Sequence, residues 1–415
     1  MPPIRVAGMD LEAIYRDLHQ YPELSFAEHR TAGIIAQHLT ALGVQVHTGI
    51  GATGVAGVVR NGSGPTVLLR ADMDALPIKE LTGLPYASTT VSKDDRGNTV
   101  PVMHACGHDI HMTCLLGATE LLITDAASWS GTLVVVFQPG EEHGGGAQVM
   151  VDDGLYTIVP RPDIVLGQHV VSFPAGTLGA YPGAAMAAVD TMEVTLFGRG
   201  GHGSSPESTI DPVVMAAATV MRLQTVVSRE ISPQHAGVVT VGTLHAGTKN
   251  NIIAAQAQLG ISVRSFDEET RSRLLDGVER VLRAESAASG APRDPDVEWG
   301  ERYPVTVNDP AATERVNDAF VREFGVHALA TVAPMSASED VGNLATAAGA
   351  PLVYWFLGGE DPQKIRAAEA AGNGGTAIGA NHSPHFAPLP QPTIDRGVHA
   401  LATAAKEFFG SPRSA

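Results

Sequence analysis

Cysteine and long apolar runs are both scarce in this sequence. Only two cysteines occur in 415 residues, which excludes a disulfide framework. The strongest apolar runs, such as LVVVF at 133–137, are far shorter than the ~20 residues of a membrane-spanning helix. The first 20 residues, MPPIRVAGMDLEAIYRDLHQ, lack the apolar stretch of a secretory signal. We therefore expect a soluble, cytoplasmic protein.

Basic residues are also under-represented. There are 27 Lys and Arg against 44 Asp and Glu, which gives a net charge of −17. Such a chain repels phosphate backbones and anionic lipid, so nucleic acid and membrane surfaces are poor partners. The composition, with 44% hydrophobic and 17% charged residues, is that of a globular protein and excludes disordered and coiled-coil classes. The length predicts two or three domains.

The first part of the chain has the pattern of an α/β domain. Ser25 to Glu28 (SFAE) has the form of a capping box, and a helix with apolar positions up to Leu42 follows, with Gly43 as the residue after its end. Alternation of strands with helices favours a mostly parallel sheet. The expected strands are 44–46, 55–59, 66–69, 132–137 and 164–166, with a helix at about 113–122.

The pattern changes near residue 189, where polar and apolar residues alternate as in a sheet with one wet face. The expected elements are strands at 191–197, 237–245 and 256–265, helices at 212–228 and 267–286, and a short strand at 296–299. This order resembles a ferredoxin-like α+β unit. We therefore expect a catalytic α/β domain formed by residues 1–188 and 301–415, with residues 189–300 inserted into it.

The densest chemical feature is the segment 103–111, MHACGHDIH. It holds three of the 16 histidines and one of the two cysteines. Thiolate and imidazole suit Zn²⁺ and neighbouring metals, and Gly107 lets the backbone turn so that Cys106 and His108 face one centre. The alternative is that Cys106 packs in the core, as we expect for Cys114 in the apolar run TCLL.

Two adjacent carboxylates, Glu141 and Glu142, follow the buried strand LVVVF. The carboxyl ends of strands in open α/β sheets are where ligands bind, and paired carboxylates are unfavourable unless positive charge lies close. One Glu could ligate a metal while the other takes a proton from water, which is the combination that metal-assisted hydrolysis requires. The alternative is a solvated acidic turn, with His143 as a surface residue.

Other candidates follow further strands. His169 ends the segment GQH, His382 lies in NHSPHF, and Asp72 and Asp74 lie in RADMDALP. A histidine of this kind is more often structural than a ligand, but a carboxylate at a strand end could orient a ligating imidazole.

The segment GRGGHG at 198–203 satisfies the dinucleotide fingerprint G-x-G-x-x-G. Pro206 and Pro212 delay the helix that such a site would open, so an NAD-dependent oxidoreductase is only a remote alternative. The phosphate-binding loop, the H-E-x-x-H helix, the deaminase P-C-x-x-C and the G-x-S-x-G elbow are absent from the sequence.

Taken together, ten segments between residues 19 and 386 resemble the aminoacylase, hippurate hydrolase and carboxypeptidase family of co-catalytic metallopeptidases. The resemblance is to metallopeptidase family twenty, in its N-acyl-amino-acid amidohydrolase branch. The segments occur in the family's order: HQYPELSFAEHRTA, LLRADMDALPIKE, MHACGHDIHMTCLLGAT, VVFQPGEEHGGGA, GQHV, GRGGHGSSP, GTKNNIIA, SVRSFD, SEDVG and NHSPHF.

The resemblance implies a two-metal hydrolase of amide bonds. The metal ligands that it implies are Cys106, His108, Glu142, His169 and His382, with the Cys at the bridging position. It makes Glu141 the general base and Asp74 a carboxylate that supports the metal site. It also makes His202 a residue that polarises the scissile carbonyl, in its own or the neighbouring subunit, where the alternative is a solvated loop histidine. Asn251 and Arg264 would hold the substrate, the Arg being suited to clamp a carboxylate.

The implied reaction is hydrolysis of an N-acyl-L-amino acid by a homodimer joined through the inserted domain. Zn²⁺ is the expected metal, and Mn²⁺, Co²⁺ and Ni²⁺ also suit these ligands. A dipeptidase or carboxypeptidase with the same centre is the nearest alternative. A metal-binding protein without catalysis is another, but it would not need the paired Glu141. The sequence leaves the acyl group and the amino acid open.

Three departures from the family pattern bear on the substrate rather than on the metal site. APLP at 387–390 stands where the family often has an acidic pair, and Ala254 stands where Pro is common. The long segment 358–380, with Gly372 to Gly375, is expected to line the substrate pocket.

Overall fold

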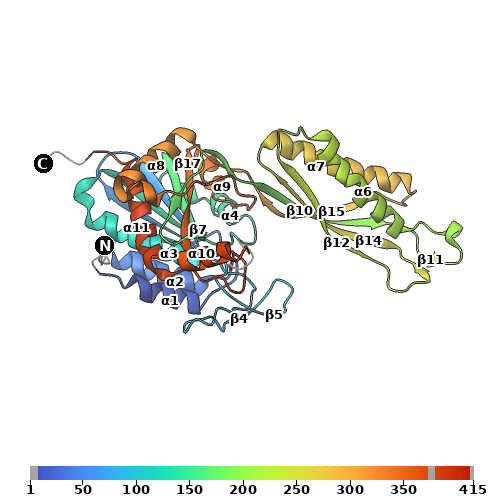
Figure 1. Cartoon of the computed structure of the whole chain (residues 1–415), viewed down its shortest axis with the longest axis horizontal. Coiled ribbons are helices and arrows are strands. Elements are labelled where there is room, and N and C mark those ends of the chain that lie inside the picture. Colours follow the sequence, from blue (N-terminus) through green and yellow to red (C-terminus); the bar gives the residue numbers. More distant parts are fainter. Residues whose placement is uncertain (1–7, 373–378, 412–415) are drawn as a thin grey trace. The chain divides into compact units, whose positions relative to one another are not determined.

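The computed structural model describes residues 8–372 and 379–411, which form two compact units (Figure 1). The first unit is drawn from Met1–Ala185, Val307–Ala333 and Asp340–Ala415. The second consists of Met186–Thr306 and Pro334–Glu339. The second unit is therefore slightly longer than the expected segment 189–300, and it also recruits six residues from the later part of the chain.

The first unit is built on a mixed seven-stranded sheet, in the spatial order β1-β2-β6-β3-β7-β17-β8. The four central strands run parallel, whereas β1, β2 and β8 are antiparallel to their neighbours. The mostly parallel α/β sheet predicted from the sequence is thus confirmed for the centre of this unit. The strands are β1 (Gln45–Ile50), β2 (Gly54–Asn61), β3 (Thr66–Asp72), β6 (Gly131–Gln138), β7 (Ile164–Pro174), β8 (Leu178–Gly179) and β17 (Leu352–Glu360).

Helices cover both faces of this sheet, so its central strands are buried on both sides. On β3, Val67 and Leu69 join a core cluster with α1, α2, α3, α8 and α11, and the intervening Leu68 and Arg70 point to the other face. The helices α4 and α9 contact β6 and β7 without joining that cluster. The helices are α1 (Leu11–Gln20), α2 (His29–Ala41), α3 (His108–Thr124), α4 (Gly146–Asp152), α5 (Leu155–Ile158), α8 (Pro310–Phe324), α9 (Gly342–Ala348), α10 (Pro362–Ala370) and α11 (Pro390–Lys406).

The second unit is a four-stranded antiparallel sheet, in the order β12-β14-β10-β15, with α6 and α7 packed on one face. Every second residue of β14 from Ala257 to Val263 is buried against these helices, as the alternating pattern predicts. The element order is β-α-β-β-α-β. The elements are β10 (Ala188–Phe197), α6 (Pro212–Glu230), β12 (Gly237–Ala246), β14 (Gln256–Ser265), α7 (Glu268–Ala288) and β15 (Asp296–Tyr303).

No helix in the described residues is long and apolar enough to cross a bilayer. Short strand pairs and a short helix add to the main elements. Within the segment 358–380, α10 was not predicted, and residues 373–378, which include most of the expected glycine-rich pocket lining, lie outside the described part. The short pairs are β4 (Val91–Lys93) with β5 (Thr99–Pro101), β9 (Gly183–Met186) with β16 (Thr306–Asn308), and β11 (Gly201–His202) with β13 (Ile252–Ile253).

The predicted capping box before α2 is wrong. The helix begins at His29 with Glu28 itself as the N-cap residue, and Ser25 Oγ donates to Asp74 Oδ2 at 2.7 Å. The Glu28 carboxylate accepts hydrogen bonds from the Phe26 and Gly140 backbone N–H groups, both at 2.9 Å. The SFAE segment therefore holds distant loops in place. The predicted end is confirmed, because Gly43 follows Leu42, the C-cap residue of the helix, with φ +77°.

A buried imidazole ties α1 to the start of α3. His19 Nδ1 lies 2.6 Å from Asp109 Oδ2, and its Nε2 lies 3.1 Å from Glu80 Oε1. Burial disfavours a charge on this ring, but the hydrogen bonds to the two carboxylates outweigh burial and raise the pKa of His19 to about 10. The folded state therefore holds His19 as an imidazolium between two carboxylates.

This ion pair predicts a pH-dependent stability. Below pH ~6.5, His19 is protonated in both the folded and the unfolded chain, and its full contribution to stability is present. Between pH ~6.5 and about 10 the unfolded chain releases this proton while the folded chain keeps it, so the free energy of unfolding falls as the pH rises. Urea denaturation from pH 6 to 10 should show this fall, and His19→Gln should flatten it.

His327→Gln, at an exposed position, is the matched control and should keep the wild-type pH profile. A His19→Gln variant with the wild-type slope above pH 6.5 would show that the His19 ion pair does not contribute.

Candidate metal centre

Cys106 and His108 flank a turn that only glycine can make here. Gly107 caps α3 with φ +82°, and a Cβ at this position would lie 2.3 Å from Val170 Cγ1. The helix therefore begins at His108, five residues before the predicted start. Both side chains are buried, and Cys106 Sγ, one His108 nitrogen and one Glu142 oxygen lie within 4.8 Å of one another.

Glu142 comes from the loop after β6 and lies between two histidines. Its Oε1 is 3.8 Å from His108 Nε2, and its Oε2 is 3.3 Å from His382 Nε2. Glu141, its neighbour, is 6% exposed. The predicted pair of carboxylates at a strand end is therefore not a solvated acidic turn.

His169 and His382 complete the set. His169 Nε2 lies 3.5 Å from Cys106 Sγ. The sequence predicts His169 just past the end of a strand, but the residue lies within β7. His382 has the unusual φ of +68°, and its N–H donates to the Ala105 carbonyl at 2.8 Å. The structure thus brings all five predicted ligands together in the first unit. Their binding of metal stays a prediction.

The chemistry of these groups fits a cation. Both ring nitrogens of His108 and Glu142 Oε1 are buried, and none of the three atoms has a hydrogen-bond partner within residues 8–372 and 379–411. Burial, with the nearby Glu142 and Glu141, raises the pKa of the Cys106 thiol well above its usual range. Burial opposes charge on His108, yet Asp72, Asp74 and Glu142 raise its pKa to about 10. A divalent cation would satisfy these atoms and favour the thiolate and the neutral imidazole.

Asp74 lies behind two of the candidate ligands. Its Oδ1 is 3.3 Å from His108 Nδ1, and its Oδ2 accepts from the Glu142 backbone N–H at 2.8 Å and from Ser25 Oγ. These contacts are those of a carboxylate that orients a ligating imidazole. They support the predicted role of Asp74, which stays a prediction.

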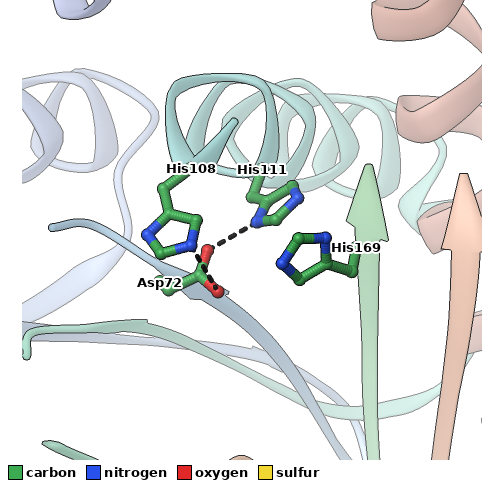
Figure 2. Close-up of side chains that lie close together, drawn as sticks. All are labelled: Asp72, His108, His111 and His169. Atoms are coloured by element: carbon green, nitrogen blue, oxygen red, sulfur yellow. Dashed lines mark hydrogen bonds and ion pairs between the residues drawn. The ribbon is translucent and has the colours of Figure 1, made fainter. Parts of the chain in front are cut away.

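Two more residues join the cluster: Asp72, which the sequence analysis named as a carboxylate that could orient an imidazole, and His111, to which it gave no role. Figure 2 shows Asp72 from β3, His108 and His111 from α3, and His169 from β7 pointing toward one another. Each has an atom within 4.8 Å of the others, as a metal site requires. The available signal was the spacing of His108 and His111, because residues three apart share one face of a helix.

The remaining predicted residues lie in the second unit. His202 on β11 is exposed, and its Nδ1 accepts a hydrogen bond from the Ser204 backbone N–H at 3.1 Å. The Asn251 carbonyl accepts from the Gly203 N–H at 2.9 Å. Arg264 on β14 donates through Nη1 to the Ser336 carbonyl and to Ser338 Oγ. Their roles stay predictions.

The glycine fingerprint at 198–203 does not form a dinucleotide site. After β10 the segment enters the two-residue strand β11, and α6 begins only at Pro212. No helix N-terminus therefore lies within the motif. The structure gives the oxidoreductase alternative no support.

Comparison with known proteins identifies the family. A profile described as peptidase family M20/M25/M40 matches residues 68–407. The chain belongs to peptidase family M20/M25/M40. It is 35% identical to thermostable carboxypeptidase 1 of Saccharolobus solfataricus over 401 residues, which cover 95% of this chain and 94% of that one. It is 38% identical to hippurate hydrolase of Campylobacter jejuni over 349 residues, which cover 82% and 86%.

A solved M20 structure has the same fold. A dinuclear metal-binding peptidase of this family from Bacillus subtilis is 28% identical, with a TM-score of 0.75 over 95% of this chain and 96% of that one. The family resemblance inferred from the sequence is thus confirmed. The protein is a metal-dependent amidohydrolase of the M20 family.

The proposed ligands predict how the metal content depends on the two cysteines. Cys106→Ala removes a thiolate from the cluster, so we expect the purified variant to lose most of its bound metal, measured by elemental analysis. Cys114→Ala is the matched control, because Cys114 is buried in α3, which begins two residues after Cys106, and its thiol contacts the Ile394 carbonyl at 3.7 Å.

The Cys114 variant should keep its metal and lose about 1 kcal/mol of stability through the small cavity. Wild-type metal content in Cys106→Ala would exclude Cys106 from the ligand set.

Proposed function

We propose that this M20 protein hydrolyses N-acyl-L-amino acids to a carboxylic acid and a free amino acid. The single observation that carries the proposal is the placement of Glu141, a buried carboxylate next in sequence to Glu142 of the candidate metal cluster. A protein that only stored metal would not need it. The similarity to a hippurate hydrolase supports the same substrate class.

Cys106, His108, Glu142, His169 and His382 would hold two divalent cations. Zn²⁺ is the first candidate for these ligands, and Mn²⁺, Co²⁺ or Ni²⁺ are the others. When bound, such cations polarise the scissile carbonyl and lower the pKa of the attacking water.

Glu141 would act as the general base and then as the general acid. It takes a proton from the water as the water oxygen bonds to the acyl carbon. It returns the proton to the amide nitrogen as the C–N bond breaks, so the amino acid leaves as a neutral amine. Asp74 would keep His108 and the Glu142 backbone in place through its contacts with both.

His202 is proposed to donate a hydrogen bond to the oxyanion that forms at the carbonyl. Because its Nδ1 accepts from the Ser204 N–H, the proton of the neutral ring must sit on Nε2. The ring therefore presents an N–H donor on the side away from Ser204. A fixed donor of this kind stabilises the charge that develops in the transition state.

Asn251 and Arg264 are proposed to hold the polar groups of the substrate. The Ser336 and Ser338 oxygens orient the Arg264 guanidinium, whose planar fork of donors matches a carboxylate. The α-carboxylate of an N-acyl-amino acid is a ligand of this shape.

The second unit is proposed to be the inserted ferredoxin-like domain through which two copies dimerise. Its strand β12 lies at an edge of the sheet, where backbone groups can pair with another strand. Large apolar side chains are exposed on β12 and α6, including Val214 (65%) and Met221 (72%). Apolar surface beside a free sheet edge is typical of a protein–protein interface.

The role of Glu141 can be tested by substitution. Glu141→Ala should lower kcat by about 10²–10⁴-fold, the usual contribution of a positioned base, while the variant keeps its two metals. Glu141→Gln, which preserves the shape, should be equally impaired. Steady-state kinetics and elemental analysis of the same preparations provide the measurement. Full activity with either side chain would overturn the assignment.

The substrate class can be tested by a hydrolysis screen with the apo enzyme refilled by each metal in turn. N-acetyl- and N-benzoyl-amino acids should be cleaved with kcat/KM at least ~10-fold above that of dipeptides with a free amino terminus. Such a ratio is within reach of one set of pocket contacts. Preferential cleavage of dipeptides would instead make the protein a dipeptidase or carboxypeptidase with the same centre.

A further inference from the structure

His111 has both ring nitrogens engaged, although it lies beside the candidate ligands. Its Nδ1 is 2.6 Å from Asp72 Oδ1, and its Nε2 is 2.7 Å from the Val170 backbone nitrogen. A backbone N–H can only donate, so His111 Nε2 must accept, and the ring proton sits on Nδ1 and points at Asp72. No lone pair is then left for a metal, although the distances alone would allow one.

Asp72 is held as an acceptor by a buried arginine. Arg70 Nη1 donates to Asp72 Oδ2 at 2.8 Å, and both side chains are fully buried. Arg70 Nε in turn donates to Gln138 Oε1 at 2.9 Å. The opposite oxygen of Asp72 therefore faces His111 as a fixed, charged acceptor, which sets the tautomer of that ring (Figure 2).

The Val170 N–H is open to a side chain because the sheet pairing ends before it. The ladder between β3 and β7 stops at Arg70 opposite Gly167, whereas the pairing with β17 continues past Val170. On the β3 side, Val170 therefore has no strand partner, and His111 takes that place. A buried N–H without any partner would destabilise the fold, so the contact with His111 satisfies a group that needs an acceptor.

The carbonyl group of Val170, which belongs to the next peptide unit, contacts His169. The Val170 carbonyl lies 2.9 Å from His169 Nδ1, so that nitrogen carries the proton and Nε2 is left to face Cys106 Sγ. Asn381 Nδ2 also donates to the Val170 carbonyl, at 3.1 Å, and to the Cys106 carbonyl at 3.3 Å. The Val170 backbone is thus bound at its N–H by His111, and at its carbonyl by His169 and by Asn381, the residue beside His382.

From this geometry we propose that His111 is a positioning residue and not a metal ligand. Supported by Asp72 and Arg70, it holds the peptide group between His169 and Val170 through the Val170 N–H, so that His169 presents Nε2 to the metal. The proposal rests on the proposed metal centre. It deepens that assignment by giving the two histidines of the GHDIH motif different roles, with His108 as a ligand and His111 as the residue that orients another ligand. Residues that orient ligands in this way typically change metal affinity 10–100-fold when they are replaced.

The test compares three variants by their affinity for Zn²⁺, measured by chelator competition, and by the visible spectrum of the Co²⁺-loaded protein. His111→Phe keeps a ring but removes both hydrogen bonds, and we expect a 10–100-fold loss of affinity. In His111→Gln, the side-chain amide has both a donor for Asp72 and an acceptor for the Val170 N–H. The Zn²⁺ affinity of this variant should therefore stay within about threefold of wild type. His104→Phe is the matched control, because His104 is buried in the same segment, MHACGHDIH, and neither of its ring nitrogens has a hydrogen-bond partner among the described residues.

The control should keep wild-type affinity and an unchanged Co²⁺ spectrum. If His111→Phe does not fold, Asp72→Asn replaces it. The amide of the new side chain must point an N–H at either Arg70 or His111, both of which are donors. Asp72→Asn should therefore lose at least tenfold in Zn²⁺ affinity, whereas His111→Gln should not.

Each outcome decides the question. Wild-type affinity in His111→Phe, or in Asp72→Asn where the Phe variant does not fold, would overturn the positioning role. Equal losses in the Phe and Gln variants, with an altered Co²⁺ spectrum in both, would make His111 a ligand. A wild-type protein that binds neither ion would contradict the metal centre itself and not this assignment alone.

Discussion

The site is governed by one electrostatic constraint, which is that acidic groups are buried together. Ionised carboxylates taken out of water are stable only with compensating charge or several hydrogen bonds. Arg70 supplies that charge for Asp72. Glu142 instead lies against Cys106 and two histidines, and one of its oxygens is buried without a hydrogen bond. A divalent cation would satisfy this second group, and it would reverse the rise in the pKa of the Cys106 thiol that burial and the carboxylates cause. Metal binding would then be linked to the stability of this end of the sheet.

Backbone conformation makes the convergence possible. Gly107 adopts a left-handed conformation against Val170, where any Cβ would clash, and this turn lets Cys106 and His108 face one point. His382 adopts the same region of φ without being glycine, and its N–H is held by the Ala105 carbonyl next to Cys106. Such conformations cost free energy and persist where surrounding contacts fix them, which is why they gather at functional sites. The candidate ligands of two distant segments are thus joined through backbone as well as through side chains.

Local patterns predicted most of the fold. The strands and helices between β10 and α7 start and end within a few residues of the expected positions, because alternation and helical spacing are properties of consecutive residues. The predictions that failed depend on distant partners. Ser25 hydrogen-bonds to Asp74, and Glu28 hydrogen-bonds to Gly140. A segment with the form of a capping box therefore binds loops 49 and 112 residues away instead of capping its own helix. His169 was expected beyond the end of a strand, but β17 continues the pairing of β7 past it. Nothing local to either segment reveals those contacts.

The histidines of the cluster show why the candidate site could be predicted only in part. Composition and spacing mark His108 and His111 equally, since both lie on one face of α3 next to Cys106. Hydrogen bonds separate them. Among the described residues, neither nitrogen of His108 has a hydrogen-bond partner, and Nδ1 has only the 3.3 Å ion-pair contact with Asp74, whereas both nitrogens of His111 are taken, by Asp72 and by the Val170 N–H. That N–H is available because β3 stops pairing with β7 at Gly167. The end of a parallel strand therefore does more than expose side chains to a ligand. It also leaves a backbone N–H unpaired with any strand, and that N–H donates a hydrogen bond to an imidazole nitrogen. A histidine that accepts such a bond no longer has this nitrogen free to bind metal.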